Sequence, residues 1–149
     1  MTTLDTRPAW GTTLLRIALG IIFVAHGGQK LFAMGPAALA GFFGSVGIPF
    51  PAFNAYLVIA IELLGGIAMI AGLGVRAIAS LFAATMVVAF ATVHGPQGFF
   101  LPNGYEFVLL VFAASIAIVL QGAGAFALDN VLAGRRLTTR ELTPARANA

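Results

Sequence analysis

Four long apolar stretches dominate the sequence and leave few folds open to it. They cover residues 14–33, 53–73, 76–93 and 105–121. Each is close to the roughly 20 residues that an α-helix needs to cross the hydrocarbon core of a bilayer. Only 9% of the residues are charged, against about 25% in soluble globular domains, so the composition excludes a soluble enzyme. We therefore predict an all-α bundle of four antiparallel transmembrane helices in a lipid bilayer.

Glycine and proline mark the ends of these stretches. Two residues, Gly74 and Val75, separate the second stretch from the third, which forces an antiparallel hairpin. The first stretch could instead be a secretory signal, because Ala38-Leu39-Ala40 resembles a cleavage site. Its apolar run is too long for a signal, however, and the polar residues from His26 to Lys30 interrupt it.

Lysine and arginine predict the orientation of the helices. They flank the N-terminal end of the first stretch, the turn between the second and third, and the C-terminal tail, where they are Arg7, Arg16, Arg76, Arg135, Arg136, Arg140 and Arg146. The other two loops have none, so both termini should be cytoplasmic in the inner membrane of a bacterium. This scatter forms no basic patch and excludes nucleic-acid binding. Arg16 and Arg76 are interpreted as side chains that snorkel to the cytoplasmic boundary.

This prediction divides the chain into three regions. Residues 1–13 form a cytoplasmic segment, residues 14–129 the transmembrane domain, and residues 130–149 a basic tail that we expect to be disordered. Within this end of the chain, Gly124–Gly134 has the pattern of a short interfacial helix.

Five ionisable residues lie within the predicted spans or at their outer ends, namely His26, Lys30, Glu62, His94 and Glu106. Charged groups inside a membrane are costly and usually face the bundle interior. At a rise of about 1.5 Å per residue, Glu62 lies roughly 13 Å deep and His26 roughly 10 Å deep. Matched depth predicts a pair between His26 and Glu62, and pairs Lys30 with Glu106 or, by reaching inward, with Glu62. The five residues are the candidate ligand-binding pocket, although each could equally be structural.

Glycines share the face that carries these polar groups. Gly20 and Gly27 lie on one stripe of the first span, while Gly65 and Gly66 lie on the second. Small residues allow transmembrane helices to approach closely. We predict that these four glycines pack helices together.

The chain holds no cysteine, so it has no thiol or thiolate for redox chemistry or for an iron–sulfur cluster. A haem held by His26 and His94 is disfavoured because the two differ in depth by most of 10 Å. No metal-ligand spacing is recognisable, and we predict no metal and no cofactor within the chain itself. A redox role would need a quinone and an external partner protein.

Several motifs in order resemble the DoxX family of small bacterial membrane proteins. They are Arg16 with Gly20, HGGQKLF, GIPFP, IELLGGIAMIAGLGVRAIA and YEFVLLVFAASIAIVLQGAGAFALD. One departure is Ala127-Leu128-Asp129, where the family often reads Ser-Leu-Asp. The resemblance implies a four-helix membrane bundle associated with oxidoreductases. The family takes its name from a subunit of an archaeal quinone-reducing thiosulfate oxidoreductase, and some relatives are partners in redox-stress complexes.

Two functions compete at this point. The first is a membrane subunit or partner of a quinone-linked redox complex, in which His26, Lys30 and Glu62 hold a quinone in an outward-facing pocket. The second is a non-catalytic scaffold or small carrier, in which the same polar residues fix helix register. The sequence leaves open whether the protein is catalytic and whether it forms a homo-oligomer.

Overall fold

The computed structural model describes residues 7–137, and within this range the regular elements are all helical, which confirms the all-α prediction. The α-helices are α1 (Arg7–Gly28), α2 (Pro36–Ser45), α3 (Pro51–Ala71), α4 (Val75–Ala89), α5 (Glu106–Gln121) and α6 (Leu128–Leu137). Two of them continue in another helical form. A π-helical segment, Gln29–Met34, extends α1, while a second π-helical segment, Phe90–His94, and a 3₁₀ turn, Gly95–Gln97, extend α4.

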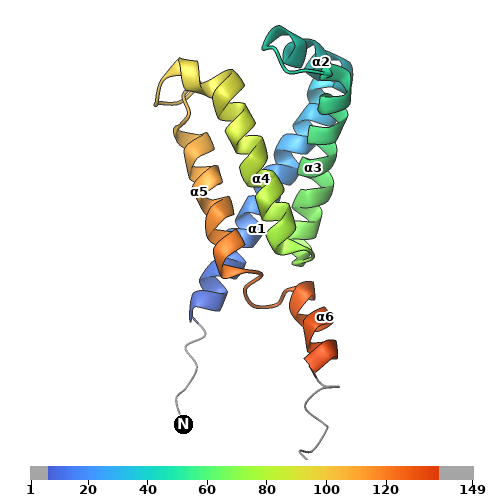
Figure 1. Cartoon of the computed structure of the whole chain (residues 1–149), viewed down its shortest axis with the longest axis vertical. Coiled ribbons are helices and arrows are strands. Elements are labelled where there is room, and N and C mark those ends of the chain that lie inside the picture. Colours follow the sequence, from blue (N-terminus) through green and yellow to red (C-terminus); the bar gives the residue numbers. More distant parts are fainter. Residues whose placement is uncertain (1–6, 138–149) are drawn as a thin grey trace, which may run out of the picture.

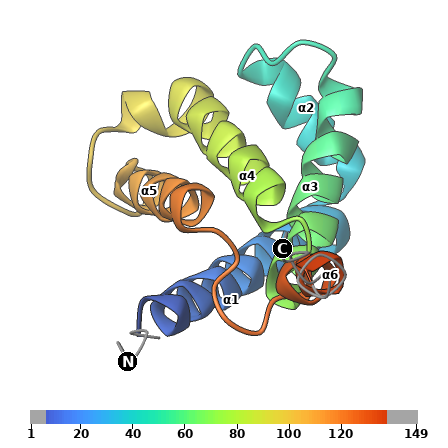
Figure 2. The same ribbon diagram turned by 60° about the horizontal axis from the view of Figure 1, so that its bottom comes forward.

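The helices form two arms that diverge from a common base (Figure 1). In one arm α1 packs along α3, and α2 covers the far end of α3; in the other, α4 packs against α5. Both described ends of the chain lie at the base, which we call the terminal end, and α6 projects from it. The opposite end, which carries α2 and the α4–α5 loop, we call the α2 end. Figure 2 shows α1 passing beneath α4 to join the two arms.

Three helical segments within the described residues are long and apolar enough to cross a membrane. They are Trp10–Met34, Pro51–Ala71 and Val75–Gln97. The fourth predicted span corresponds to α5, an apolar helix of 16 residues. At about 1.5 Å per residue α5 is roughly 24 Å long, somewhat short of the roughly 30 Å hydrocarbon core.

The interface between α1 and α3 rests on glycines. A Cβ atom built on Gly20 would lie 2.8 Å from the backbone oxygen of Gly66, and one built on Gly66 would lie 2.9 Å from the backbone oxygen of Gly20. Further along, a Cβ on Gly27 would lie 2.9 Å from the backbone nitrogen of Leu63. The two backbones therefore touch at points where any larger side chain would hold them apart.

The second arm joins this pair through aromatic packing. The rings of Phe23 on α1 and Phe82 on α4 are stacked, with centroids 3.5 Å apart and planes 12° from parallel, and both side chains are buried. Gly65 of α3 admits Phe82, whose Cε1 would lie 3.1 Å from a Cβ built there. This stack belongs to the main hydrophobic core, with Leu19, Met69 and Ile118.

Arg16 corrects one sequence-based interpretation. It is 1% exposed and is not a snorkelling anchor. Its Nη1 donates to the backbone oxygens of Met69 and Ile70 at 2.6 and 2.7 Å. These carbonyls lie in the last turn of α3, where the usual helical partners run out. The N–H of Gly72 also donates to the Met69 oxygen at 3.1 Å, and the buried guanidinium supplies the other hydrogen bonds. Arg76, by contrast, is exposed.

The turn between α3 and α4 is closed by the C-terminal part of the chain. Asp129 accepts hydrogen bonds from the backbone N–H groups of Gly74 and Val75 at 2.8 and 2.9 Å, and so caps α4. Its own N–H donates to the Gly72 oxygen at 2.9 Å. Gly72 has a φ of +77°, and a Cβ there would lie 2.6 Å from the Cα of Ala127. Only glycine suits both the left-handed backbone and this close approach.

Two helices lie where the sequence predicted loop or tail. α2 occupies the first predicted loop, with Pro36 at its first turn and Leu39 and Phe43 buried against α3. α6 overlaps the predicted interfacial helix but continues to Leu137, so the expectation of disorder from residue 130 is wrong for residues 130–137. The rest of that tail, residues 138–149, and residues 1–6 of the N-terminal segment lie outside the described range.

Candidate functional site: a pocket around an ion pair

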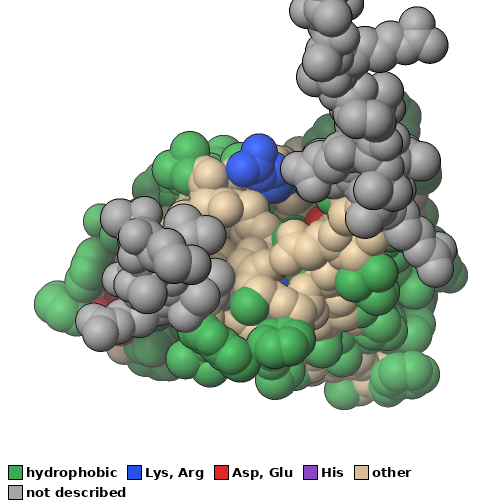
Figure 3. All heavy atoms as spheres, turned by 90° about the horizontal axis from the view of Figure 1, so that it is seen from below, with side chains coloured by type: hydrophobic (Ala, Val, Ile, Leu, Met, Phe, Trp, Pro, Cys, Tyr) green, Lys and Arg blue, Asp and Glu red, His purple; other side chains and the backbone are tan. Residues whose placement is uncertain are grey.

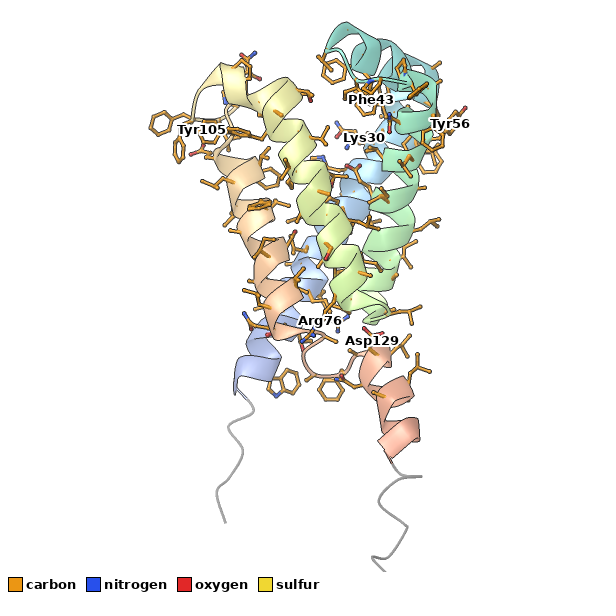
Figure 4. The ribbon with its side chains drawn as sticks, viewed as in Figure 1. Lys30, Phe43, Tyr56, Arg76, Tyr105 and Asp129 are labelled. Atoms are coloured by element: carbon orange, nitrogen blue, oxygen red, sulfur yellow. The ribbon has the colours of Figure 1, made fainter. Side chains whose placement is uncertain are left out.

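A pocket of about 540 Å³ opens between the two arms at the α2 end. It receives side chains from α1, α2, α3, α4 and α5, and four of the five candidate site residues line it, namely His26, Lys30, Glu62 and His94. In Figure 4, Lys30 and Phe43 lie on the inner side of the α1–α3 arm, beside the space that separates it from α4.

The centre of this pocket is an ion pair between Lys30 and Glu62. The Lys30 Nζ atom lies 2.7 Å from Glu62 Oε1 and 2.6 Å from Oε2. The Glu62 side chain is 5% exposed and that of Lys30 is 23% exposed. An ammonium has three hydrogen-bond donors. Two are used by the carboxylate, so one remains for a ligand in the pocket.

His26 lines the same pocket and takes no part in this ion pair. Its ring centroid is 6.2 Å from that of Phe107 on α5. No group within residues 7–137 forms a hydrogen bond with the imidazole, and the side chain is exposed. The pair predicted between His26 and Glu62 does not form; the inward-reaching alternative from Lys30 does. His26 is thus a second polar group available to a ligand.

His94 and Glu106 organise the α4–α5 loop. The Nδ1 atom of His94 lies 2.9 Å from the backbone oxygen of Asn103. Glu106 Oε1 accepts a hydrogen bond from the backbone N–H of Leu101 at 2.8 Å. The predicted contact between Lys30 and Glu106 does not form. His94 still faces the pocket, whereas Glu106 is not among the residues that line it.

The remaining lining is almost entirely apolar. Buried residues form the floor, including Phe23, Leu39, Phe43, Val108 and Val111. Exposed residues form the rim, including Leu57, Leu81, Val88 and Leu101. A charged pair in such surroundings is shielded from water, which strengthens its electrostatic interactions. The arrangement suits a ligand that is mostly apolar and carries one or two hydrogen-bond acceptors.

Three polar residues of the pocket were missed by the sequence analysis. Asn54 Nδ2 donates to the Pro49 oxygen at 2.6 Å, and Thr85 and Thr92 donate to carbonyls one turn earlier on their own helix. Thr85 lies on α4 and Thr92 on the π-helical segment that extends it, and a spacing of seven residues is typical of two side chains on one face of a helix. That spacing was the available signal. Their hydroxyls are already hydrogen-bonded, so they are lining groups of lower priority than Lys30 and His26.

The acidic and histidine side chains of the described residues do not converge on one point. Among residues 7–137, no three side chains of histidine, cysteine, aspartate or glutamate gather as metal ligands would. The chemistry on hand in the pocket is hydrogen bonding, charge and proton exchange.

The fold and pocket define a class: a small helical membrane protein with an ion pair at the base of an apolar pocket. Residues 11–95 match the model of the DoxX family, and the chain belongs to this family. It is 41% identical to "Putative oxidoreductase CatD" of Bacillus subtilis (strain 168) over 119 residues. This aligned region covers 80% of this chain and 84% of that protein. It is 36% identical to an uncharacterised protein of Haemophilus influenzae over 122 residues. This aligned region covers 78% of this chain and 86% of that protein. No solved structure matches.

Proposed function

We propose that this protein is the membrane subunit of a redox complex and that its pocket binds a quinone. The observation that carries the proposal is the pocket itself, where the Lys30–Glu62 pair lies at one end of an apolar lining. A quinone offers a flat apolar ring with two carbonyl acceptors. The third Lys30 donor and the His26 imidazole are groups suited to those carbonyls. The name of the Bacillus subtilis relative is consistent with a redox role.

The chain's own residues would bind the quinone and supply protons. Reduction of a quinone to a quinol consumes two electrons and two protons. Lys30, held beside Glu62, and His26 are the groups that can exchange protons with the carbonyl oxygens. The sequence has no cysteine for thiol redox, so we propose that a partner protein delivers or accepts the electrons.

We further propose that α5 is a fourth span and that the terminal end is cytoplasmic. Arg76 lies at the terminal end, and the sequence has four further arginines after α5, which is the distribution that the positive-inside rule expects on the cytoplasmic side. The pocket at the α2 end then opens toward the outer side of a bacterial inner membrane. The length of α5 fits this assignment if the bilayer thins locally, which costs only fractions of a kcal/mol per Å.

A scaffold is the second candidate, and one observation favours it. The ion pair joins the π-helical extension of α1 to α3, beside the close contact of Gly27 with α3. A buried pair of this kind can fix the register of two helices without any chemistry. In that case the protein would hold partners in the membrane, or act as a small carrier.

Quinone binding to the purified protein tests the proposal. The full chain in detergent should bind a short-chain ubiquinone analogue saturably, measured by equilibrium dialysis. Ala84→Trp fills the pocket from α4 without altering the ion pair, and should weaken binding about tenfold or more. Lys30→Met should weaken it by a similar factor, because a hydrogen bond from a charged donor contributes about 1.5–3 kcal/mol.

Ala60→Trp is the matched control, since Ala60 is exposed on α3 and does not line the pocket. It should bind the quinone like the wild type. Absence of saturable binding to a folded wild-type protein would refute the quinone proposal and leave the scaffold. Equal affinities for Ala84→Trp and Ala60→Trp would place binding outside this pocket.

A further inference from the structure

The terminal end holds a second hollow, distinct from the quinone pocket. It has a volume of about 820 Å³ and lies among the starts of α4 and α6, the end of α5, and Thr12 of α1. Part of its wall comes from small residues, namely Gly74, Gly122, Ala123 and Gly124. Figure 3 shows this face as a centre of backbone and polar side chains, with basic atoms beside it and a rim of hydrophobic side chains.

Among the side chains that the structure describes, Arg76 is the cation that lines this hollow. Its side chain is exposed and lines the space, and in Figure 4 it lies between the lower ends of α4 and α5 and the start of α6. The guanidinium lies close against Gly122, where its Nη2 would be 3.4 Å from a Cβ. In the described part of the chain, no carboxylate or carbonyl accepts a hydrogen bond from it. The guanidinium is thus held in place with its donors unused.

The acidic residue of the hollow is already engaged. Asp129 lines it, yet its two carboxylate oxygens accept the N–H groups of Gly74 and Val75 at 2.8 and 2.9 Å. Arg16, buried beside Gly72 of the same turn, interacts electrostatically with this carboxylate, so two arginines stand against one aspartate at this end. The local balance of charge is therefore positive, and the missing component is an anion.

Aromatic residues at the same end indicate where the hollow lies relative to the membrane surface. Trp10 and Phe126 are both exposed, and their ring centroids are 5.1 Å apart. Exposed aromatic side chains at the end of a membrane-spanning helix lie at the level of the lipid headgroups. An anion at this level is most abundant as the phosphodiester of an acidic phospholipid, and the planar fork of arginine matches phosphate oxygens.

We propose that this hollow binds a phosphodiester monoanion, supplied by the headgroup of an anionic phospholipid, and that Arg76 is its principal ligand. The N–H groups of the guanidinium donate to the phosphate oxygens. The small residues of the segment 122–124 leave room for the headgroup, and the acyl chains extend along the lipid-facing side of α4. The bound lipid then joins α4, α5 and α6 at the base of the bundle.

Lipid retention by the full-length protein tests this proposal. The protein is extracted in mild detergent, mixed with equal amounts of phosphatidylglycerol and phosphatidylcholine, and analysed by native mass spectrometry. The wild type should retain phosphatidylglycerol about tenfold more than phosphatidylcholine, as expected for charge-assisted hydrogen bonds. Arg76→Gln should reduce this preference to near equality, while Arg76→Lys should keep part of it.

Arg140→Gln is the charge-matched control, because it removes one arginine from the tail and should keep the preference. Ala133→Glu places a carboxylate in the hollow and leaves Arg76 in place, and it should abolish the preference even if Arg76→Gln fails to fold. Inorganic phosphate at millimolar concentration separates the two sources of the anion. Displacement of the lipid by phosphate, or a wild type with no preference for phosphatidylglycerol, would overturn the proposal. A preference that survives both Arg76→Gln and Ala133→Glu would overturn it as well.

Discussion

Replacing Gly66 with alanine should separate α1 from α3. The added Cβ would lie 2.7 Å from Val24 Cγ2, and 2.9 Å from both the Gly20 oxygen and the Val24 nitrogen. The last two atoms are backbone, so a side-chain rotation cannot relieve the contact. The helices must move apart by about 0.5 Å, a gap that forfeits a quarter or more of the dispersion energy of each contact it opens.

The expected loss in the free energy of unfolding is about 1–3 kcal/mol, the usual cost of forcing an extra methyl group into a packed interface. Gly28→Ala is the control. It lies at the end of α1, has helical backbone angles, and no atom lies within 4 Å of its added Cβ. This variant should be neutral or up to about 1 kcal/mol more stable, because alanine favours the helix over glycine.

Unfolding by sodium dodecyl sulfate in mixed micelles, followed by circular dichroism, measures both variants. Gly66→Ala should unfold at a clearly lower detergent fraction than the wild type. The same midpoint for Gly66→Ala and Gly28→Ala would refute the conclusion that backbone contact at the glycines holds the two helices together.

Two further substitutions examine the terminal end. Arg16→Met should lower the free energy of unfolding by about 2–4 kcal/mol, because two hydrogen bonds from a charged donor to the end of α3 are lost. Arg76→Met, at an exposed position, should cost far less in the same detergent titration, and equal losses would contradict the buried role of Arg16. Asp129→Ala should cost about 1–2 kcal/mol by removing the cap of α4, with faster hydrogen exchange at the amides of Gly74 and Val75. Unchanged exchange at these amides would mean that the carboxylate does not protect them.

The helices themselves could be predicted because apolar runs bounded by glycine and proline are a local signal. The role of Arg16 could not. Its place near the end of an apolar run is the same for a snorkelling side chain and for a buried one. What decides between them is the end of α3, more than fifty residues later in the chain, which lies against the guanidinium. That contact depends on how α1 crosses α3, and the residues around position 16 give no sequence signal for it.

Four of the five candidate residues line one pocket, and of the predicted pairings only the inward-reaching one from Lys30 to Glu62 forms. The sequence analysis matched His26 with Glu62 because it counted the depth of each residue in the membrane along straight, upright helices. In the structure α1 becomes π-helical at Gln29, and the long side chain of Lys30 reaches inward across the difference in depth. The pocket walls also depend on α2, whose sequence was taken as a loop. Its contribution depends on burying Leu39 and Phe43 against α3, which is a tertiary effect.

The cap supplied by Asp129 has a consequence for the order in which the protein is made. The turn between α3 and α4 is synthesised more than fifty residues before the carboxylate that binds its N–H groups. A nascent chain that already contains α1 to α5 still has the start of α4 uncapped and Gly72 without its partner from the later segment. The base of the bundle is therefore completed only when residue 129 has left the ribosome and returned to the hairpin. The segment that follows α5 therefore closes a turn between two helices that were made before it.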